Sequence, residues 1–165
     1  MLIEANDHDF ETLIGGGVPA GLKLPPGGVE TPEVLGMLRL LANPIRQSIG
    51  HAAWMIVENE EIVGLLSITK TLPTSGAAEI GYGVAPSRRG RGVCSRAVRD
   101  FLCWAENHPL IREVLVETAV DNLPSQKVLE HNSFSRVGER LDEEDGPLFC
   151  WKFVLSNPLT FATDF

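Results

Sequence analysis

The chain has 165 residues, of which 44% are hydrophobic and 22% are charged, and its formal net charge is −8. A chain of this length buries roughly 68–70% of its unfolded surface, so we expect one domain that needs no disulfide or metal to fold. The acidic balance argues against a general nucleic-acid binder.

The cysteines and the hydropathy of the chain indicate the cellular compartment in which the protein works. Cys94, Cys103 and Cys150 form an odd set without the spacing of zinc ligands. No apolar run approaches the roughly 18 residues of a membrane helix, and the N-terminal segment lacks the pattern of a secretory signal. We therefore expect a reduced, cytoplasmic protein with no metal site and no nucleic-acid or membrane partner.

The first half of the chain predicts two helices between strands. Proline fixes the backbone angle φ and lacks an N–H group, so Thr31-Pro32 is a typical helix start and Pro44 a typical helix end. Asn59-Glu60 separates two apolar runs and predicts a hairpin. The expected elements are a strand at Leu2–Ala5, a helix from Asn6 or Asp7 to Ile14, a loop at Gly15–Gly28, a helix from Thr31 to about Ala42, and strands at Ala52–Glu58 and Glu61–Lys70.

The second half alternates strands with helices. The expected elements are a strand at Ala77–Val84, a helix from about Gly92 to Asn107, a strand at Ile111–Ala119, a helix from Asp121 or Asn122 to about Glu130, and strands at Ser133–Glu139 and Leu148–Leu155. The whole order, β-α-α-β-β-β-α-β-α-β-β, predicts a single α/β domain over residues 1–155 and a tail at 156–165. Leu159 and Phe161 in that tail predict either a homodimer contact or a frayed end.

The most informative stretch is Val84–Arg99, which reads VAPSRRGRGVCSRAVR and holds five arginines but no acidic residue. It lies between a predicted strand and a predicted helix. Gly90 and Gly92 permit backbone conformations that put successive N–H groups on one side. The N-terminus of the helix adds free N–H donors and a partial positive charge. The stretch therefore predicts an anion site, for a phosphate or a pyrophosphate.

Two phosphate-binding patterns fit this stretch poorly. A Walker A loop needs G-x-x-x-x-G-K-[ST], and the chain contains no such run. A dinucleotide fingerprint could be read as Gly90-x-Gly92-x-x-Ser95, with Glu117 as the ribose-binding acid. However, Val84–Arg89 separates the strand from the first glycine, the third glycine is a serine, and too few later βα units follow for a doubly wound sheet.

The third pattern, R-x-x-G-x-[GA], corresponds to Arg89–Cys94, with a cysteine at its last position. The surrounding run EIGYGVAPSRRGRGVC, the strand VLVETAVDN that ends at Asn122, and the run NLPSQKVLEHNSF resemble, in this order, the GNAT acyltransferase superfamily. The resemblance covers about Ala52 to Leu155 and is greatest to the branch that acetylates ribosomal proteins and small amines. It implies that residues 1–155 form one acyl-CoA N-acyltransferase domain.

The resemblance also implies a fold and a cofactor site. The sheet would be mixed and mainly antiparallel, with a splay between Ala77–Val84 and Ile111–Ala119 that receives acetyl-CoA. The strand at Tyr82–Val84 would pair with the pantetheine arm, the Val84 N–H would face the thioester carbonyl, and the Asn122 side chain would bind pantetheine. The pyrophosphate would be held by the backbone of Arg89, Gly90, Arg91, Gly92, Val93 and Cys94.

Two residues are the catalytic candidates that the resemblance implies. Glu79 would be the base that takes a proton from the amine, although it could also be a structural strand carboxylate. Many relatives use a tyrosine as the acid, but Leu129 occupies that position here. Ser125 would then reach the sulfur and contact the cofactor, unless its hydroxyl serves only the helix turn. Asn122 could likewise be a plain helix cap.

Cys94 stands where the family has glycine or alanine. A cysteine is small enough to be tolerated at this position. A sharper hypothesis is that the N-terminus of the helix lowers the pKa of its thiol and favours a mixed disulfide with CoA.

The function implied by the resemblance is transfer of an acetyl group from acetyl-CoA to a primary amine by direct attack in a ternary complex. The acceptor could be a small molecule or a protein N-terminus, because the sequence contains no acceptor motif. The alternative is a CoA-binding sensor or regulatory module without turnover.

Overall fold

The computed structural model describes residues 1–156 and contains a sheet covered by helices. The elements are β1 (Leu2–Glu4), α1 (Asp7–Ile14), α2 (Pro32–Ile49), β2 (Ala53–Glu58), β3 (Glu61–Ile68), β4 (Ala77–Val84), a 3₁₀ turn η1 (Pro86–Arg88), α3 (Val93–Glu106), β5 (Glu113–Ala119), α4 (Leu123–His131), β6 (Ser135–Asp142) and β7 (Gly146–Val154). All predicted helices and strands within residues 1–156 are present, with ends that differ by a few residues except at the end of α2.

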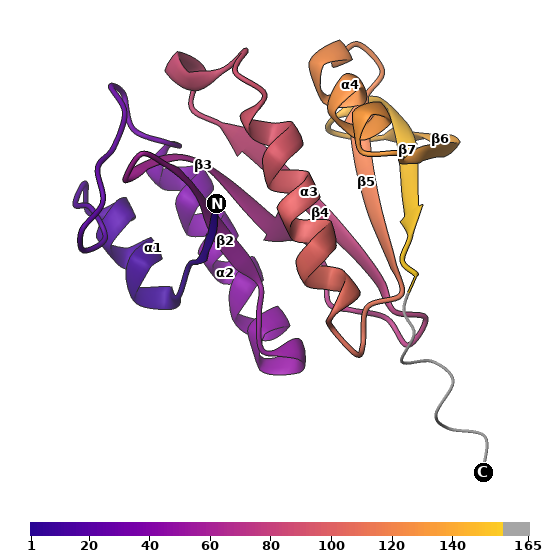
Figure 1. Ribbon diagram of the computed structural model, residues 1–165, viewed down its shortest axis with the longest axis horizontal. Coiled ribbons are helices and arrows are strands. Elements are labelled where there is room, and N and C mark those ends of the chain that lie inside the picture. Colours follow the sequence, from indigo (N-terminus) through magenta and orange to yellow (C-terminus); the bar gives the residue numbers. More distant parts are fainter. Residues whose placement is uncertain (157–165) are drawn as a thin grey trace.

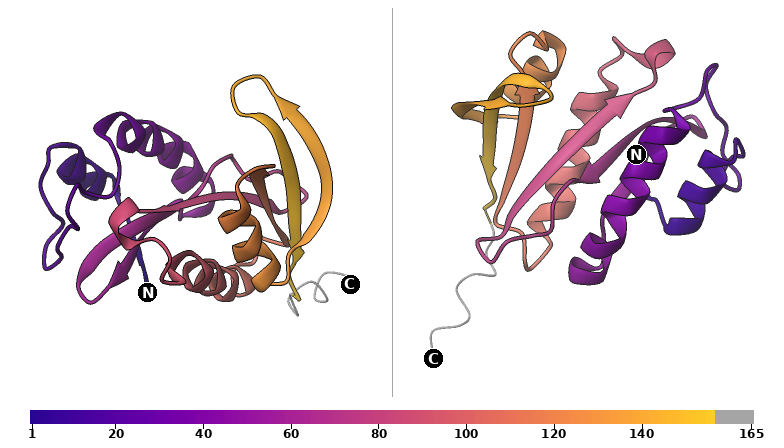
Figure 2. Two further views of the ribbon diagram at one scale, coloured as in Figure 1. Left: turned by 90° about the horizontal axis from the view of Figure 1, so that it is seen from above. Right: turned by 180° about the vertical axis from the view of Figure 1, so that it is seen from behind.

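The seven strands form one sheet in the order β1-β2-β3-β4-β5-β7-β6. β4 and β5 are the one parallel pair among the strands that the structure describes. Helices α1 and α2 lie on one face of the sheet, and α3 and α4 lie on the other (Figures 1 and 2). The predicted α/β fold with a mixed, mainly antiparallel sheet is confirmed.

Helix α2 is longer than predicted, because it continues through Pro44 to Ile49. Its last turns bury Ala42, Ile45 and Ile49 in the core, and each buried isoleucine contributes about 1.5–3 kcal/mol. Together the two isoleucines outweigh the cost of about 3 kcal/mol for a proline inside a helix. The helix ends instead at Gly50, whose φ of 85° is a left-handed conformation that glycine adopts without strain.

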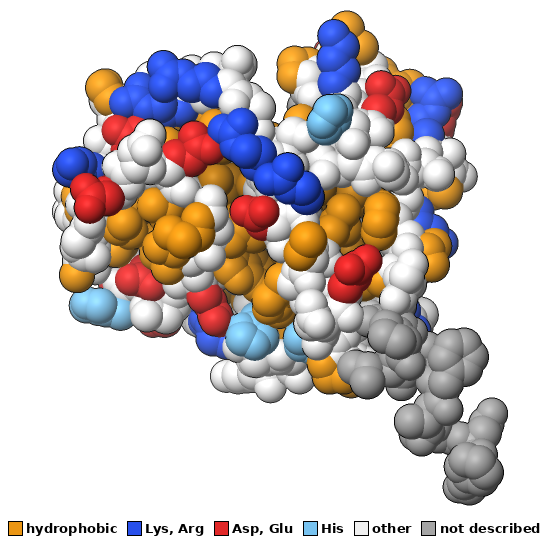
Figure 3. Space-filling model, viewed as in Figure 1, with side chains coloured by type: hydrophobic (Ala, Val, Ile, Leu, Met, Phe, Trp, Pro, Cys, Tyr) orange, Lys and Arg blue, Asp and Glu red, His pale blue; other side chains and the backbone are white. Residues whose placement is uncertain are grey.

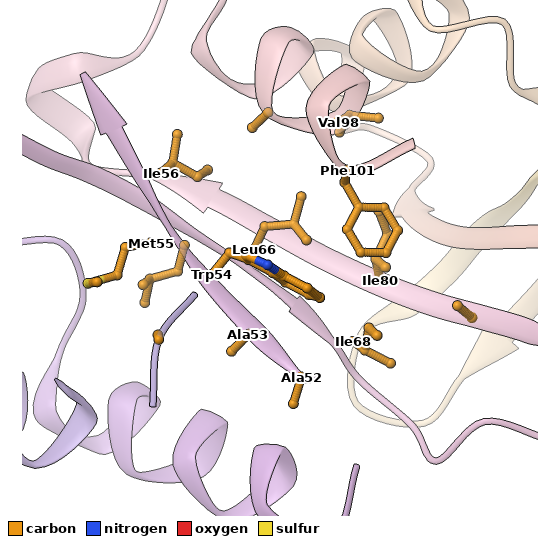
Figure 4. Close-up of a cluster of buried hydrophobic side chains, with 14 of the residues drawn as sticks. Ala52, Ala53, Trp54, Met55, Ile56, Leu66, Ile68, Ile80, Val98 and Phe101 are labelled. Atoms are coloured by element: carbon orange, nitrogen blue, oxygen red, sulfur yellow. The ribbon is translucent and has the colours of Figure 1, made fainter. Parts of the chain in front are cut away.

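Aromatic side chains fix α3 on the sheet. Trp54 of β2 meets Phe101 of α3 edge to face, with 5.4 Å between ring centroids. The ring centroids of Trp54 and Trp104, also in α3, are 4.8 Å apart. Such pairs add about 0.5–1.5 kcal/mol beyond the area that they bury. Phe101 is fully buried in the same cluster as Ile80 of β4 (Figure 4). This packing holds α3 against β4, the strand that leads into the turn before α3.

The two central strands separate, as predicted. β4 and β5 pair over only three positions, from Ala77 opposite Glu113 to Glu79 opposite Leu115. Beyond Glu79, β4 stays paired with β3 up to Val84, while β5 continues against β7. Figure 1 shows the strands diverging toward η1 and α4. The splay therefore opens beside the turn that carries the predicted anion site.

The described part of the chain ends at Ser156, so the predicted tail contact of Leu159 and Phe161 lies outside it. Within residues 1–156, no helix combines the length and the apolar character that crossing a membrane requires.

Gly64 allows β3 to approach β4 closely, which gives a first prediction. A Cβ on Gly64 would overlap the backbone carbonyl oxygen of Gly83. Gly64→Ala should therefore lower the free energy of unfolding, measured with urea, by about 1–3 kcal/mol. Gly36→Ala in α2 is the control, since its Cβ would meet no atom within 4 Å and should add about 0.5–1 kcal/mol. Equal stability of the Gly64 variant and the wild type would contradict the close approach.

Candidate functional site

A cleft of about 730 Å³ lies between the end of β4, the turn before α3, and the first turns of α3 and α4. Figure 3 shows a notch at the top of the molecule between this turn and α4, with basic side chains on the turn. Of the predicted site residues, the lining includes Tyr82, Val84, Arg89, Gly90, Gly92, Val93, Cys94, Asn122 and Ser125. Glu79 and Arg91 are not part of it.

The turn at the mouth of the cleft has the backbone shape expected of a glycine-rich anion site. Gly90 and Gly92 have φ values of 76° and 70°, both in the left-handed region. Gly92 is also the N-cap of α3, and it has no side chain to bond the N–H groups of the first helical turn. These donors and the positive end of the helix dipole thus remain available to an anion.

Two of the five arginines in this stretch are hydrogen-bonded to carboxylates of the β2–β3 hairpin, and a third, Arg99, lies 4.0 Å from the neighbouring Asp100. Arg88 binds both carboxylate oxygens of Glu61, with N–O distances of 2.5 and 3.1 Å. This guanidinium holds the pKa of the Glu61 carboxyl below its usual value. Arg96 binds Glu58 at 2.5 Å. Both acids lie in the β2–β3 hairpin, so the positive charge of the turn is smaller than the sequence predicted.

Arg89 and Arg91 carry the remaining charge of the turn. The Arg89 Nε donates to the Val84 carbonyl oxygen at 3.3 Å, which brings this guanidinium to the end of β4 in the cleft. Among the described residues, the Arg91 guanidinium makes no hydrogen bond or ion pair. Arg89 and Lys127 are therefore the cationic side chains of the cleft lining that no carboxylate pairs with among the described residues.

The end of β4 directs backbone N–H groups into the splay. The Ala85 N–H donates to the Val63 carbonyl at 2.8 Å, so Ala85 faces β3. Because the direction of bonding alternates along an antiparallel strand, the N–H groups of Val84 and Tyr82 face the other way, toward β5. β5 has left β4 at this point. An extended ligand could therefore add itself to this edge of β4.

Tyr82 and Ser125 meet in the cleft. Their hydroxyl oxygens are 2.9 Å apart, across the opening between β4 and α4. Burial raises the pKa of Tyr82 to about 12, although the hydrogen bond between Tyr82 and Ser125 opposes the shift. The Ser125 N–H donates to the Asn122 Oδ1 at 3.2 Å, so Asn122 caps α4. Sequence reasoning predicted each residue separately but missed the contact of their hydroxyl groups.

Glu79 lies outside the cleft, on the opposite face of β4 from Tyr82. Side chains alternate between the faces of a strand, so residues three apart point to opposite sides. The Glu79 carboxylate accepts from the Lys70 Nζ at 2.8 Å and from the Thr69 hydroxyl at 3.3 Å. The two predicted catalytic residues, Glu79 and Ser125, thus flank β4 from its two faces.

Glu30 is a charged residue beside β4 that the sequence did not indicate. Its Oε1 lies 4.0 Å from the position that a Cβ on Gly83 would occupy. Gly83 and Glu79 are on the same face of β4, since they are four residues apart in a strand. Glu30 therefore shares a face with Glu79. It follows a loop rich in glycine and proline, whose path no periodic pattern determines.

Cys94 differs from one of its two predictions, the lowered pKa of its thiol. Its side chain lines the cleft, but burial raises the pKa of its thiol, and the nearby Arg89 offsets this only in part. The expected lowering by the helix N-terminus is wrong, because desolvation of the thiolate is the larger effect. Leu129, at the position where the family has a tyrosine, is fully buried and does not reach the cleft.

Comparisons with known proteins point to one family. The family model described as an acetyltransferase (GNAT) domain matches residues 30–135. The chain is 33% identical over 107 residues to an uncharacterized N-acetyltransferase, YjdG, of Bacillus subtilis (strain 168), covering 64% of this chain and 61% of that protein. It is 30% identical over 85 residues to the ribosomal-protein-serine acetyltransferase of Escherichia coli (strain K12), covering 52% and 48%. The chain thus spans about half to three fifths of these relatives.

Solved structures show the same fold. The structure of RimL, a ribosomal-protein alpha-N-acetyltransferase, in complex with coenzyme A has a TM-score of 0.72 with this chain. The sequences are 20% identical, and the match covers 93% of each chain. In that complex CoA forms a disulfide with a cysteine of RimL. The fold of the present chain is therefore GNAT-like.

Proposed function

Because the chain belongs to the GNAT acetyltransferase family, we propose that it transfers an acetyl group from acetyl-CoA to a primary amine by direct attack in a ternary complex. The observation that carries this proposal is the splay: it adjoins a glycine turn with free N–H donors and lies along an edge of β4 that no strand covers beyond Glu79 in the described residues. A long cosubstrate with phosphates at one end and a thioester at the other fits both features.

The cosubstrate would bind through the backbone. The turn from Arg89 to Cys94 would hold the pyrophosphate by its N–H groups, and Arg89 would add a charged contact. The pantetheine arm would lie along β4 as an added strand. The Val84 N–H would then donate to the thioester carbonyl, where negative charge develops as the amine attacks. Asn122 lines the same cleft and could contact pantetheine while capping α4.

The acceptor would approach from the other face of β4. Glu79 on that face would take the proton that the amine must lose, directly or through a water. Its pairing with Lys70 keeps the carboxylate in a fixed position. Direct attack needs the amine held close to one face of the thioester carbonyl, and the placement of Glu79 on the face of β4 opposite to Ser125 keeps the proton acceptor apart from the groups near the sulfur. The carboxylates of Glu30 and Glu79 would attract a cationic amine, of a small molecule or of a protein N-terminus.

Acetyl transfer and simple CoA binding predict different outcomes in one experiment. In both cases the protein binds CoA, so CoA at 100 times its Kd should raise the free energy of unfolding by about 2.7 kcal/mol. Only the transferase should release free thiol from acetyl-CoA when small amines and peptides with free N-termini are added. Stabilisation by CoA without thiol release from any acceptor would favour the sensor or regulatory module. Absence of stabilisation would reject both functions.

Arg89 and Arg88 provide a matched test of the pyrophosphate contact. Arg89→Ala should weaken CoA binding, measured by calorimetry, by roughly 10–100-fold, because a hydrogen bond to a charged group contributes about 1.5–3 kcal/mol. Arg88→Ala should leave the affinity nearly unchanged, since Arg88 is engaged by Glu61. Equal losses in the two variants would contradict the assignment of Arg89.

Glu79→Gln tests the base. The variant should lower kcat/KM by roughly 10²–10⁴-fold and lose the acidic limb of the pH–rate profile, because glutamine cannot accept the proton. Glu113→Gln is the control: Glu113 lies on the neighbouring strand and pairs with Lys152 at 3.2 Å, away from the splay. A profile that keeps its shape in Glu79→Gln would rule out Glu79 as the base.

A further inference from the structure

We infer that Tyr82, the only tyrosine of the chain, is a positioning residue for acetyl transfer: with Ser125 it presents one hydroxyl hydrogen to the sulfur of acetyl-CoA. This inference rests on the proposed function and adds the chemistry at the leaving group. We call Tyr82 Oη and Ser125 Oγ the hydroxyl pair. The sequence predicted a role for the backbone of Tyr82 only.

The hydroxyl pair is held from two directions. Tyr82 comes from β4, which is fixed by its pairing with β3. Ser125 comes from the first turn of α4, where its own N–H is bound by Asn122. Both side chains line the cleft into which the Val84 N–H also points, and their oxygens are 2.9 Å apart. The pair therefore lies beside the edge of β4 along which the pantetheine arm would run.

The hydroxyl pair has one O–H donor to spare. Two hydroxyl groups carry two hydrogens, and their mutual hydrogen bond uses one of them. Among the described residues, neither oxygen has a further hydrogen-bond partner. Whichever group donates within the pair, one O–H therefore remains to donate into the cleft. A thiolate leaving group is an acceptor that such a donor would stabilise.

The pair donates a hydrogen bond and not a proton. The pKa of Tyr82 is raised to about 12, whereas that of a thiol is about 8.5, so the thiolate is the weaker base. During transfer a bond forms between nitrogen and the carbonyl carbon, and the carbon–sulfur bond breaks with its electron pair on sulfur. The proton released by nitrogen leaves through Glu79 or water. Tyr82 and Ser125 keep their protons, and the thiolate takes one later from solvent.

The test measures kcat, the KM for acetyl-CoA and the free energy of unfolding of Tyr82→Phe, Ser125→Ala and the double variant. Each single change should lower kcat by roughly 10–100-fold with KM unchanged, because the hydroxyl that remains loses the partner that orients it, and its hydrogen bond to the charged sulfur is lost. The double variant should be no slower than Ser125→Ala, as expected for groups that act as a unit. Ser125→Thr, which keeps the hydroxyl, should restore most of kcat.

Two further readouts separate positioning from a structural or acidic role. The alkaline side of the kcat–pH profile should have the same shape in the wild type and in Tyr82→Phe, since no proton is transferred from the pair. Because the chain has one tyrosine, fluorotyrosine labels Tyr82 alone, and its fluorine NMR signal should shift when CoA is added.

Several outcomes would overturn the inference. They are an unchanged kcat in Tyr82→Phe, independent effects of the two single changes, an alkaline limb that depends on Tyr82, or a fluorine signal that CoA does not move. A loss of stability in Tyr82→Phe with normal kcat would assign the contact a purely structural role. Failure of the wild type to release thiol with any amine would instead reject the proposed function.

Discussion

The need to satisfy backbone hydrogen-bonding groups organises this molecule. A buried N–H without a partner costs free energy comparable to a lost hydrogen bond, and most of the sheet meets this requirement through neighbouring strands. Inside the sheet the exception lies between β4 and β5, which pair only up to Glu79 and Leu115. The N–H groups of Tyr82 and Val84 then face an opening, and the site is built around this interruption of the sheet.

The surrounding elements hold the interruption in place. Trp54 and Phe101 lock α3 against the sheet, so the turn before α3 starts where β4 ends. β4 also divides the site into two sides. The hydroxyl pair and the glycine turn lie on the side of α3 and α4, while the carboxylates of Glu30 and Glu79 lie on the other. In the proposed reaction, β4 would therefore keep the groups that bind the two reactants on separate faces.

Sequence reasoning succeeded where structure depends on neighbours along the chain. The strand at Ala77–Val84 and the turn at Gly90 and Gly92 follow from local patterns, whereas the arrangement of the sheet and the candidate cofactor site were implied by the resemblance to the GNAT superfamily. Sequence reasoning failed for contacts between distant residues. Arg88 and Glu61 are 27 positions apart, and Tyr82 and Ser125 are 43 apart, so no periodic pattern links them. The continuation of α2 through Pro44 likewise depends on tertiary burial that outweighs a local preference.

The pairing of arginines with the β2–β3 hairpin bears on turnover. Acetyl-CoA and CoA carry the same phosphates, so each additional free arginine at the turn would strengthen the binding of cosubstrate and product equally. Binding energy that is equal for acetyl-CoA and CoA does not accelerate the chemical step. It only makes the product CoA leave the site more slowly. Glu61 and Glu58 pair with two of the guanidinium groups of this stretch. In the proposed reaction, the hairpin would thereby limit the charge that holds the product at the mouth of the cleft.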